Sequence, residues 1–264
     1  MTGSTDAVTL TWPTPSVALL TLNRPDVRNA MTEDLTAGWH EHIERVREDE
    51  RVRVLVVTGA GPSFCAGADL SWLDQASEND ATPDRIRRRM LPFYRTWLAA
   101  RDLPVPVIAA VNGPAIGAGL ALALSCDLRY AAPTAAFAAP FIHLGTHTGM
   151  AMTALLPEAI GATRAREMLY TGRSVTAQEA HGWGLVSEVA QDVVAEAVGV
   201  ATRLAEAAPI ATRLLKRGLE QGRYGFNASL EWEALAQPVS LTTQDIHEGV
   251  QAQREHRPPR FRDR

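Results

Sequence analysis

The stretch "AAVNGPAIGAGLALALSCDLRYAA", residues 109–132, joins a strand-like run to a turn with three glycines and then to an apolar helix. A helix N-terminus leaves backbone N–H groups without partners and carries positive potential. Small residues in such a turn let a ligand approach the backbone closely. The helix expected over 120–124 contains no acid, base or nucleophile. The stretch therefore predicts a ligand site of backbone atoms, and any proton transfer requires side chains from elsewhere.

A second loop of the same kind, residues 64–69 ("FCAGAD"), follows the apolar strand-like run over 51–59. Two such loops brought together would offer two N–H donors to one carbonyl oxygen, which is an oxyanion hole. The alternative is a pair of tight strand-to-helix turns that hold no ligand. A dinucleotide fingerprint is excluded, because Leu122 stands where the third glycine or alanine belongs, and no Gly-Lys-Ser/Thr triplet of a P-loop occurs.

The composition is that of an ordinary globular protein, with 264 residues, 46% hydrophobic and 21% charged residues. The net charge of -4 gives no indication of nucleic-acid binding. Only Cys65 and Cys126 occur, in no metal-ligand pattern, so we expect no disulfide framework, no metal and a cytoplasmic location. The N-terminal residues do not resemble a signal peptide, and no apolar run approaches the ~18 residues of a membrane span.

Strand and helix patterns alternate along the first part of the chain, which predicts an α/β fold. A helix is expected to begin after Thr32, and the spacing of Met90, Leu91, Tyr94 and Trp97 predicts one apolar helix face. A short helix is expected at Leu70. The chain is predicted to be mostly helical from Met150 onward. Strands are expected over 7–12, 16–23, 51–59, 104–112, 128–132, 135–140 and 185–190, and helices over 32–48 and 85–100.

Taken together, these segments resemble the crotonase superfamily, also called the enoyl-CoA hydratase/isomerase family. The resemblance is carried by "LTLNRPDVRNAM", "VLVVTGAGPSFCAGADL", the stretch quoted first, "EMLYTGRSVTAQEAHGWGLVSEV" and "HRPPRF", and covers nearly the whole chain. It implies a spiral of ββα units with an acyl-CoA site over residues 1–200. It also implies a helical region over 201–264 that forms a homotrimer or a dimer of trimers.

The resemblance also implies an acyl-CoA ligand whose thioester oxygen lies between the backbone N–H groups of Ala68 and Ala118. Coenzyme A would enter as part of the substrate, with no tightly bound cofactor. The residues expected around its adenine and phosphates are Arg28, Ala66, Asp69 and Leu70. Arg28 is the candidate phosphate contact; the alternative is a solvated loop arginine.

The acid–base residues of the family's hydratases are absent. By motif position, the two glutamates that activate water and deliver the proton fall at Ala121 and Phe141, and neither side chain exchanges a proton. An aspartate used by some dienoyl isomerases and aryl dehalogenases falls at Gly149. We therefore expect an acyl-CoA site without standard hydratase chemistry.

Other side chains are candidates for the missing function. His147 is predicted to reach the pocket floor and to act in catalysis, because histidine titrates near neutrality. His143 is expected to be structural. Tyr94 is expected in the acyl pocket wall or in core packing, and Cys65 is expected to be a small buried residue. The arginines at 85, 87, 88 and 89 are expected on a solvated helix face, or near the coenzyme A entrance.

Three functions remain open from the sequence. The first is an enzyme that stabilises an enolate-like intermediate of an acyl-CoA, of isomerase, lyase or decarboxylase type. The run "GMAMT" over 149–153 resembles that of some decarboxylases in polyketide assembly, although their lysine after the first loop is absent. The second is a non-catalytic acyl-CoA binding protein. The third is an enoyl-CoA hydratase with non-standard residues.

Overall fold

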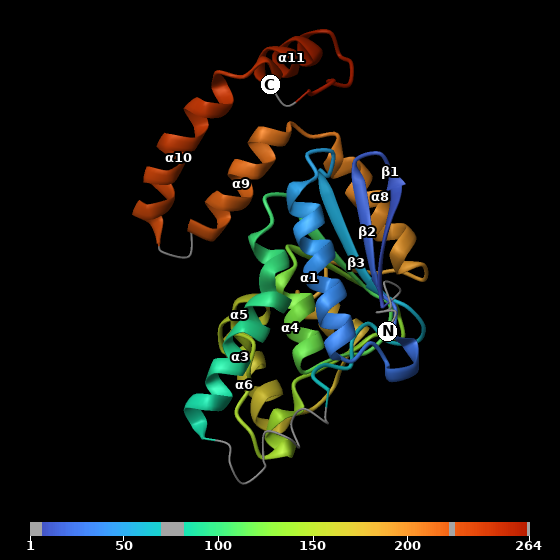
Figure 1. Ribbon diagram of the computed structural model, residues 1–264. Coiled ribbons are helices and arrows are strands. Elements are labelled where there is room, and N and C mark those ends of the chain that lie inside the picture. The colour runs from blue at the N-terminus through green and yellow to red at the C-terminus, as the bar shows by residue number, and fades with distance from the viewer. Residues whose placement is uncertain (1–6, 70–81, 222–224, 263–264) are drawn as a thin grey trace.

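The computed structural model describes residues 7–69, 82–221 and 225–262 (Figure 1). The short helix expected at Leu70 lies outside these residues. None of the helices in the described ranges is long and apolar enough to cross a membrane.

A six-stranded sheet forms the centre of the molecule, in the order β1-β2-β3-β4-β6-β9. The first pair is antiparallel, and every later pair is parallel. All residues of β3 and β4 are buried, as expected for parallel strands covered on both faces. The strands are β1 (Val8–Thr14), β2 (Val17–Leu22), β3 (Val54–Gly59), β4 (Val107–Val111), β6 (Leu128–Ala131) and β9 (Glu188–Val189).

Alternate residues of β2, β3 and β4 belong to two hydrophobic clusters, because successive side chains point to opposite faces. Val54 and Val56 of β3 pack in the cluster that contains α8 (Val193–Ala205). Leu55 and Val57 pack in the larger cluster, with residues of α1 (Glu33–Glu48), α3 (Pro83–Leu98) and α4 (Ala118–Ser125). Figure 1 shows α1 and α8 flanking the first three strands.

A second, three-stranded sheet consists of β5 (Ala115–Ile116), β7 (Ala136–Ala138) and β8 (Val175–Thr176), in the order β5-β7-β8. β5 leads directly through Gly117 into α4, so this sheet fixes where α4 begins. The sequence did not indicate β5 or β8, because two residues show no periodicity. It also placed the start of the helix two residues late, since α4 begins at Ala118.

The predicted helix after Thr32 is confirmed, with Thr32 as its N-cap residue. The helix predicted over 85–100 is present as α3, shifted by two residues, and a 3-10 turn over Ala99–Asp102 follows it. The remaining helices of this part are α5 (Met152–Ile160), α6 (Ala162–Thr171) and α7 (Ala177–Gly182), with 3-10 turns over Pro25–Val27 and Pro140–Leu144.

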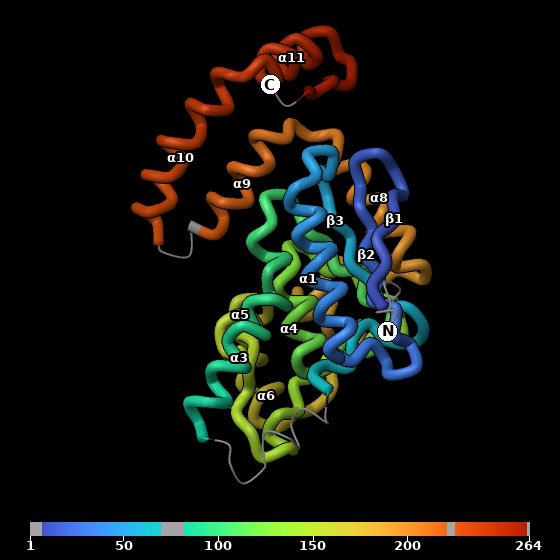
Figure 2. Tube along the Cα trace, in the orientation of Figure 1, coloured from blue at the N-terminus to red at the C-terminus, as the bar shows by residue number. Residues whose placement is uncertain are grey.

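Three helices, α9 (Pro209–Gln221), α10 (Phe226–Leu241) and α11 (Gln244–Arg254), form one end of the molecule. Both views show them at the opposite end from α3 and α6 (Figures 1 and 2). Residue 200, the position expected to divide the spiral core from the helical region, lies in α8, which packs on the sheet. None of the side chains of α10 is buried in the single chain.

Candidate functional site

The two predicted small-residue loops meet in the structure. A parallel bridge joins Cys65 to Ala115, and the Ile116 N–H donates a hydrogen bond to the Cys65 carbonyl over 3.0 Å. A Cβ atom on Gly119 would lie 2.1 Å from the Cys65 carbonyl oxygen. One on Gly67 would lie 2.6 Å from the Ile116 carbonyl oxygen. The close approach of the loops therefore requires glycine at both positions.

Asn29 holds the turn that precedes the first loop. Its buried side-chain amide donates to the carbonyl oxygens of Ser63 over 2.9 Å and Ala60 over 3.0 Å, and its Oδ1 accepts from the Arg24 N–H over 2.8 Å. Arg28, beside it, uses its carbonyl to accept from the Ala66 N–H over 3.0 Å. Such a satisfied network fixes the loop backbone.

Ala68 and Ala118 are the two residues whose N–H groups were predicted to bind an oxygen. Within the described ranges, no hydrogen bond is donated by either backbone N–H. Ala118 is the first residue of α4, so its N–H belongs to the unpaired donors of a helix N-terminus. Both residues line one cavity, and unpaired donors at a cavity wall are available to a ligand.

This cavity has a volume of about 450 Å³ and a mainly apolar wall. Such a volume suits an apolar group the size of a short acyl chain. The polar side chains in the wall belong to Asp69, Tyr94, Thr146 and His147. The other lining residues are Val27, Ala30, Ala66, Gly67, Ala68, Met90, Phe93, Ile116, Gly117, Ala118, Pro140, Phe141, Leu144, Gly149 and Met150.

Most of the residues predicted for the site line this cavity, whereas Arg28 and Ala121 do not. Arg28 is exposed beside Val27, and no hydrogen bond or ion pair of its guanidinium is found within the described residues. Ala121 is fully buried in α4 and is not part of the wall. Leu70 lies outside the described residues.

The Phe141 ring covers the part of the cavity wall formed by Gly117 of the second loop. A Cβ atom on Gly117 would lie 3.6 Å from Cζ of Phe141, so the ring lies directly over the second loop. An apolar ring thus lies where the family's hydratases were expected to have a carboxylate.

His147 is exposed at the cavity wall, and its Nδ1 lies 2.6 Å from the Thr148 carbonyl oxygen. A carbonyl only accepts hydrogen bonds, so Nδ1 carries the proton in the neutral ring and Nε2 keeps a lone pair. His143 instead uses Nε2 to contact the Thr171 carbonyl over 2.9 Å, which ties the Pro140–Leu144 turn to the end of α6.

Burial raises the pKa values of two further side chains, and this determines which protonation state each one has near neutral pH. Burial raises the pKa of the Cys65 thiol to about 12, so this cysteine is not an activated nucleophile. Burial also raises the pKa of the Tyr94 phenol, which therefore stays protonated near neutral pH. The described residues contain no group of three or more histidine, cysteine or acidic side chains that could hold a metal ion.

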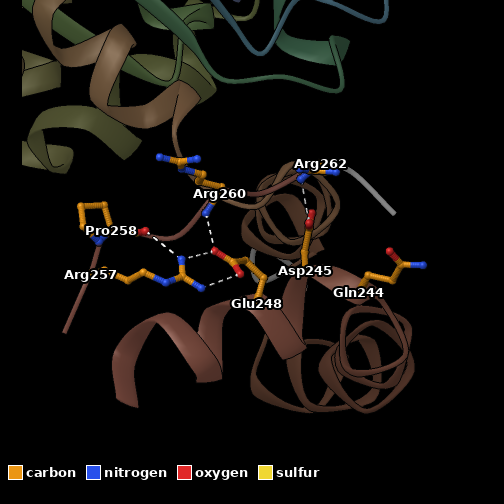
Figure 3. Close-up of a pocket in the computed structure, with 7 residues that line it drawn as sticks. All are labelled: Gln244, Asp245, Glu248, Arg257, Pro258, Arg260 and Arg262. Carbon is orange, nitrogen blue, oxygen red and sulfur yellow. Dashed lines mark hydrogen bonds and ion pairs between the residues drawn. The ribbon is translucent and has the colours of Figure 1, made fainter. Parts of the chain in front are cut away.

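A second cavity, of about 600 Å³, lies beside α11, and Figure 3 shows its charged residues. Arg257 forms a bidentate ion pair with Glu248, over 2.6 and 3.0 Å. The N–H of Arg260 donates to Glu248 over 2.8 Å, and the N–H of Arg262 donates to Asp245 over 2.7 Å. These carboxylates hold the C-terminal segment on α11, so we assign the cavity a structural role.

The sheet order, the paired loops and the helical C-terminal region define a crotonase-type α/β fold. The sequence matches the enoyl-CoA hydratase/isomerase family over residues 14–264, and the chain belongs to this family. Among solved structures, the enoyl-CoA hydratase of Bacillus anthracis superposes with a TM-score of 0.91 at 34% identity, covering 98% of this chain and 100% of that chain.

Two relatives illustrate the range of names in the family. A "Probable enoyl-CoA hydratase echA12" of Mycobacterium leprae is 39% identical over 262 residues, covering 96% of this chain and 89% of that protein. The "(E)-benzylidenesuccinyl-CoA hydratase" of Thauera aromatica is 37% identical over 251 residues, covering 93% of this chain and 95% of that protein.

Proposed function

We propose that this protein is a crotonase-type enzyme that binds an acyl-CoA thioester in the cavity at the start of α4. The observation that carries the proposal is the pair of Ala68 and Ala118 N–H groups, which donate to no described residue and belong to one mainly apolar cavity. Donors preorganised in this way stabilise negative charge on a thioester oxygen. The hydratase names of the relatives support an acyl-CoA as the ligand class.

The reaction we propose passes through an enolate-like intermediate. When a bond at the α carbon breaks, its electron pair moves toward the thioester carbonyl, and the two N–H groups stabilise the oxygen that gains charge. Decarboxylation or C–C cleavage is favoured over efficient hydration, because Ala121 and Phe141 transfer no proton. Isomerisation, which moves a proton from one carbon to another, requires a different acid–base group. His147 is the candidate acid–base group, since its Nε2 is left with a lone pair.

Coenzyme A is proposed to lie along the first loop, near Arg28, Ala66, Asp69 and Leu70. The exposed guanidinium of Arg28 makes no hydrogen bond or ion pair to a described residue, which suits a phosphate contact. An Arg28→Gln variant is expected to weaken acyl-CoA binding more than binding of the matching acyl-pantetheine, which lacks the nucleotide phosphates. Equal weakening of both ligands would contradict this role.

The test of the proposed function combines two measurements on the same preparation. Loss of the enoyl-thioester absorbance reports hydration of crotonyl-CoA, and calorimetry reports binding of butyryl-CoA. A general acid–base group contributes roughly 10² to 10⁴-fold, so we expect little hydration alongside clear binding. Efficient hydration would favour the hydratase alternative, and absent binding would contradict an acyl-CoA ligand.

A non-catalytic acyl-CoA binding protein is the second candidate, favoured by Ala121 and Phe141 at the two expected glutamate positions. It predicts that bound acyl-CoA thioesters are recovered unchanged after incubation. Chemical analysis of a panel of acyl-CoA thioesters distinguishes the two functions, because the enzyme converts at least one of them.

We also propose that α9, α10 and α11 assemble the chain into a homotrimer or a dimer of trimers. Support comes from large apolar side chains exposed on these helices: Leu215, Leu219, Phe226, Leu230, Leu235, Val239, Leu241 and Val250. Light scattering is expected to give a trimer or hexamer, and a monomer would contradict the proposal. Leu235→Asp is expected to dissociate the assembly, while Gln178→Asp on the exposed face of α7 serves as the control.

A further inference from the structure

Tyr94 occupies space that a side chain at position 149 would otherwise need. A Cβ atom placed on Gly149 would lie 2.3 Å from the Tyr94 hydroxyl oxygen and 2.9 Å from Cζ. A Cβ atom at position 149 and the Tyr94 hydroxyl therefore cannot both occupy these positions. The absence of a side chain at Gly149 therefore leaves space for the Tyr94 phenol. Both residues line the cavity.

The segment around Gly149 is held in an uncommon backbone conformation. The next two residues, Met150 and Ala151, have φ angles of 52° and 54°, in the left-handed region that non-glycine residues rarely adopt. Met150 is buried, so core packing stabilises this turn. Strain of this kind persists only where the surrounding structure enforces it. The turn fixes Gly149 against the Tyr94 ring.

The Tyr94 hydroxyl has no strong acceptor within the described part of the chain. Its hydrogen-bond contact there is to Sδ of Met90 at 4.0 Å, and a thioether is a weak acceptor. The ring packs near that of Phe93, whose centroid lies 6.3 Å away at a 60° tilt. Because burial raises the pKa of the phenol, the group is a hydrogen-bond donor near neutral pH.

We propose that the Tyr94 hydroxyl recognises the acyl chain, and that the protein prefers acyl-CoA thioesters bearing an oxygen acceptor beyond the thioester. That acceptor is a hydroxyl, carbonyl or carboxylate group. The proposal rests on the proposed function, since it requires the acyl chain to enter this cavity. A plain saturated chain leaves a partly buried donor without an acceptor, and a site built around a donor discriminates against such ligands.

The experiment uses four acyl-CoA thioesters with four-carbon chains: butyryl-CoA, 3-hydroxybutyryl-CoA, acetoacetyl-CoA and succinyl-CoA. Calorimetry on the full chain gives a Kd for each. One neutral hydrogen bond corresponds to about 10-fold in Kd. We expect at least one oxygenated ligand to bind about 10-fold more tightly than butyryl-CoA.

Tyr94→Phe keeps the ring and removes only the hydroxyl. It is expected to abolish the preference, weakening the favoured ligand about 10-fold while the Kd for butyryl-CoA changes by less than about twofold. Gly149→Ala, which must displace the hydroxyl, is expected to reproduce the loss for the favoured ligand. Tyr170→Phe, at a tyrosine that is 75% exposed, is the matched control and keeps the preference.

Two results would overturn the inference while leaving the proposed function intact. One is equal binding of all four thioesters by the unaltered protein. The other is a preference that survives Tyr94→Phe. If the folded, unaltered protein bound none of the four, both the inference and the proposed function would fall.

Discussion

The cavity at the start of α4 and the cavity beside α11 differ in whether the polar groups at their walls already have hydrogen-bond partners. In the first, the N–H groups of Ala68 and Ala118 donate to no described residue, and most of the wall is apolar. In the second, Glu248 accepts from Arg257 and from the Arg260 backbone. The carboxylate of Glu248 is thus already paired, whereas the two backbone donors of the first cavity are available to a ligand. The comparison shows that charged residues around a cavity can serve the fold, while backbone groups at an apolar wall are left for a ligand.

The largest expected effect comes from removing a donor in the first cavity. Ala118→Pro deletes one N–H at the first position of α4, where proline is compatible with a helix. Loss of one donor of this kind costs roughly 10² to 10³-fold in rate. The measurement is turnover of whichever acyl-CoA the unaltered protein converts, with circular dichroism to establish folding. Ala118→Gly, which keeps the N–H, is the control. Unchanged turnover in folded Ala118→Pro would place the thioester oxygen elsewhere.

The next largest effect is expected on stability, from removing an ion pair that joins α9 to the loops beside the sheet. Nζ of Lys216 lies 2.9 Å from Oδ2 of Asp127 and donates to the Val105 carbonyl over 2.8 Å. Lys216→Met leaves Asp127 without its cation. Because that carboxylate is partly exposed, we expect a loss of roughly 2–3 kcal/mol in the free energy of unfolding.

Denaturant titration measures this loss. Arg217→Met, at the exposed neighbouring position, is the control and is expected to change the free energy of unfolding by less than about 0.5 kcal/mol. Equal stability of the two variants would mean that the Lys216–Asp127 pair does not anchor α9.

A smaller, local effect is expected from Glu248→Gln in the second cavity. Hydrogen bonds from Arg257 and from the Arg260 N–H lower the pKa of Glu248 from 4.5 to about 2. Since the folded-state pKa is the lower one, the stabilisation is complete above about pH 4.5 and is lost as the pH falls toward about 2. Glu248→Gln should raise hydrogen exchange over residues 257–262 at pH 7.

The control for that experiment is Glu233→Gln, at an exposed position of α10. It is expected to leave hydrogen exchange over 257–262 unchanged. Exchange that is insensitive both to Glu248→Gln and to acid would contradict the structural role assigned to the second cavity.

The smallest effect tests whether the first loop is rigid. Cys65 lies in that loop, and burial raises the pKa values of Cys65 and Cys126 to about 12. Neither thiol is expected to react with Ellman's reagent in the native protein at pH 8, and two should react per denatured chain. Rapid reaction of Cys65 in the native state would show that the loop opens.

The larger strands and both loops could be predicted from the sequence, because β3 and β4 are continuous apolar runs that end in small residues. β5 and β8 could not, since each has two residues and exists only through pairing with β7. The meeting of the two loops depends on bridges between distant residues, such as Cys65 with Ala115. Only the family resemblance anticipated it.

The burial of the side chains at the site could not be predicted from local sequence either. Helical spacing puts Tyr94 and Trp97 on one face of α3, yet Trp97 is fully buried while Tyr94 is half-buried at the cavity. Trp97 stacks on Trp39, with ring centroids 5.2 Å apart, whereas the Tyr94 hydroxyl lies against Gly149, far along the chain. No pattern around residue 94 contains that information.

A crystal structure of this protein with a bound saturated acyl-CoA, such as butyryl-CoA, would locate the thioester oxygen directly. We expect the thioester oxygen about 3 Å from both the Ala68 and the Ala118 nitrogen atoms, with the acyl chain in the cavity that contains Phe141 and Tyr94. A bound acyl-CoA whose thioester oxygen lies away from these two nitrogen atoms would contradict this expectation.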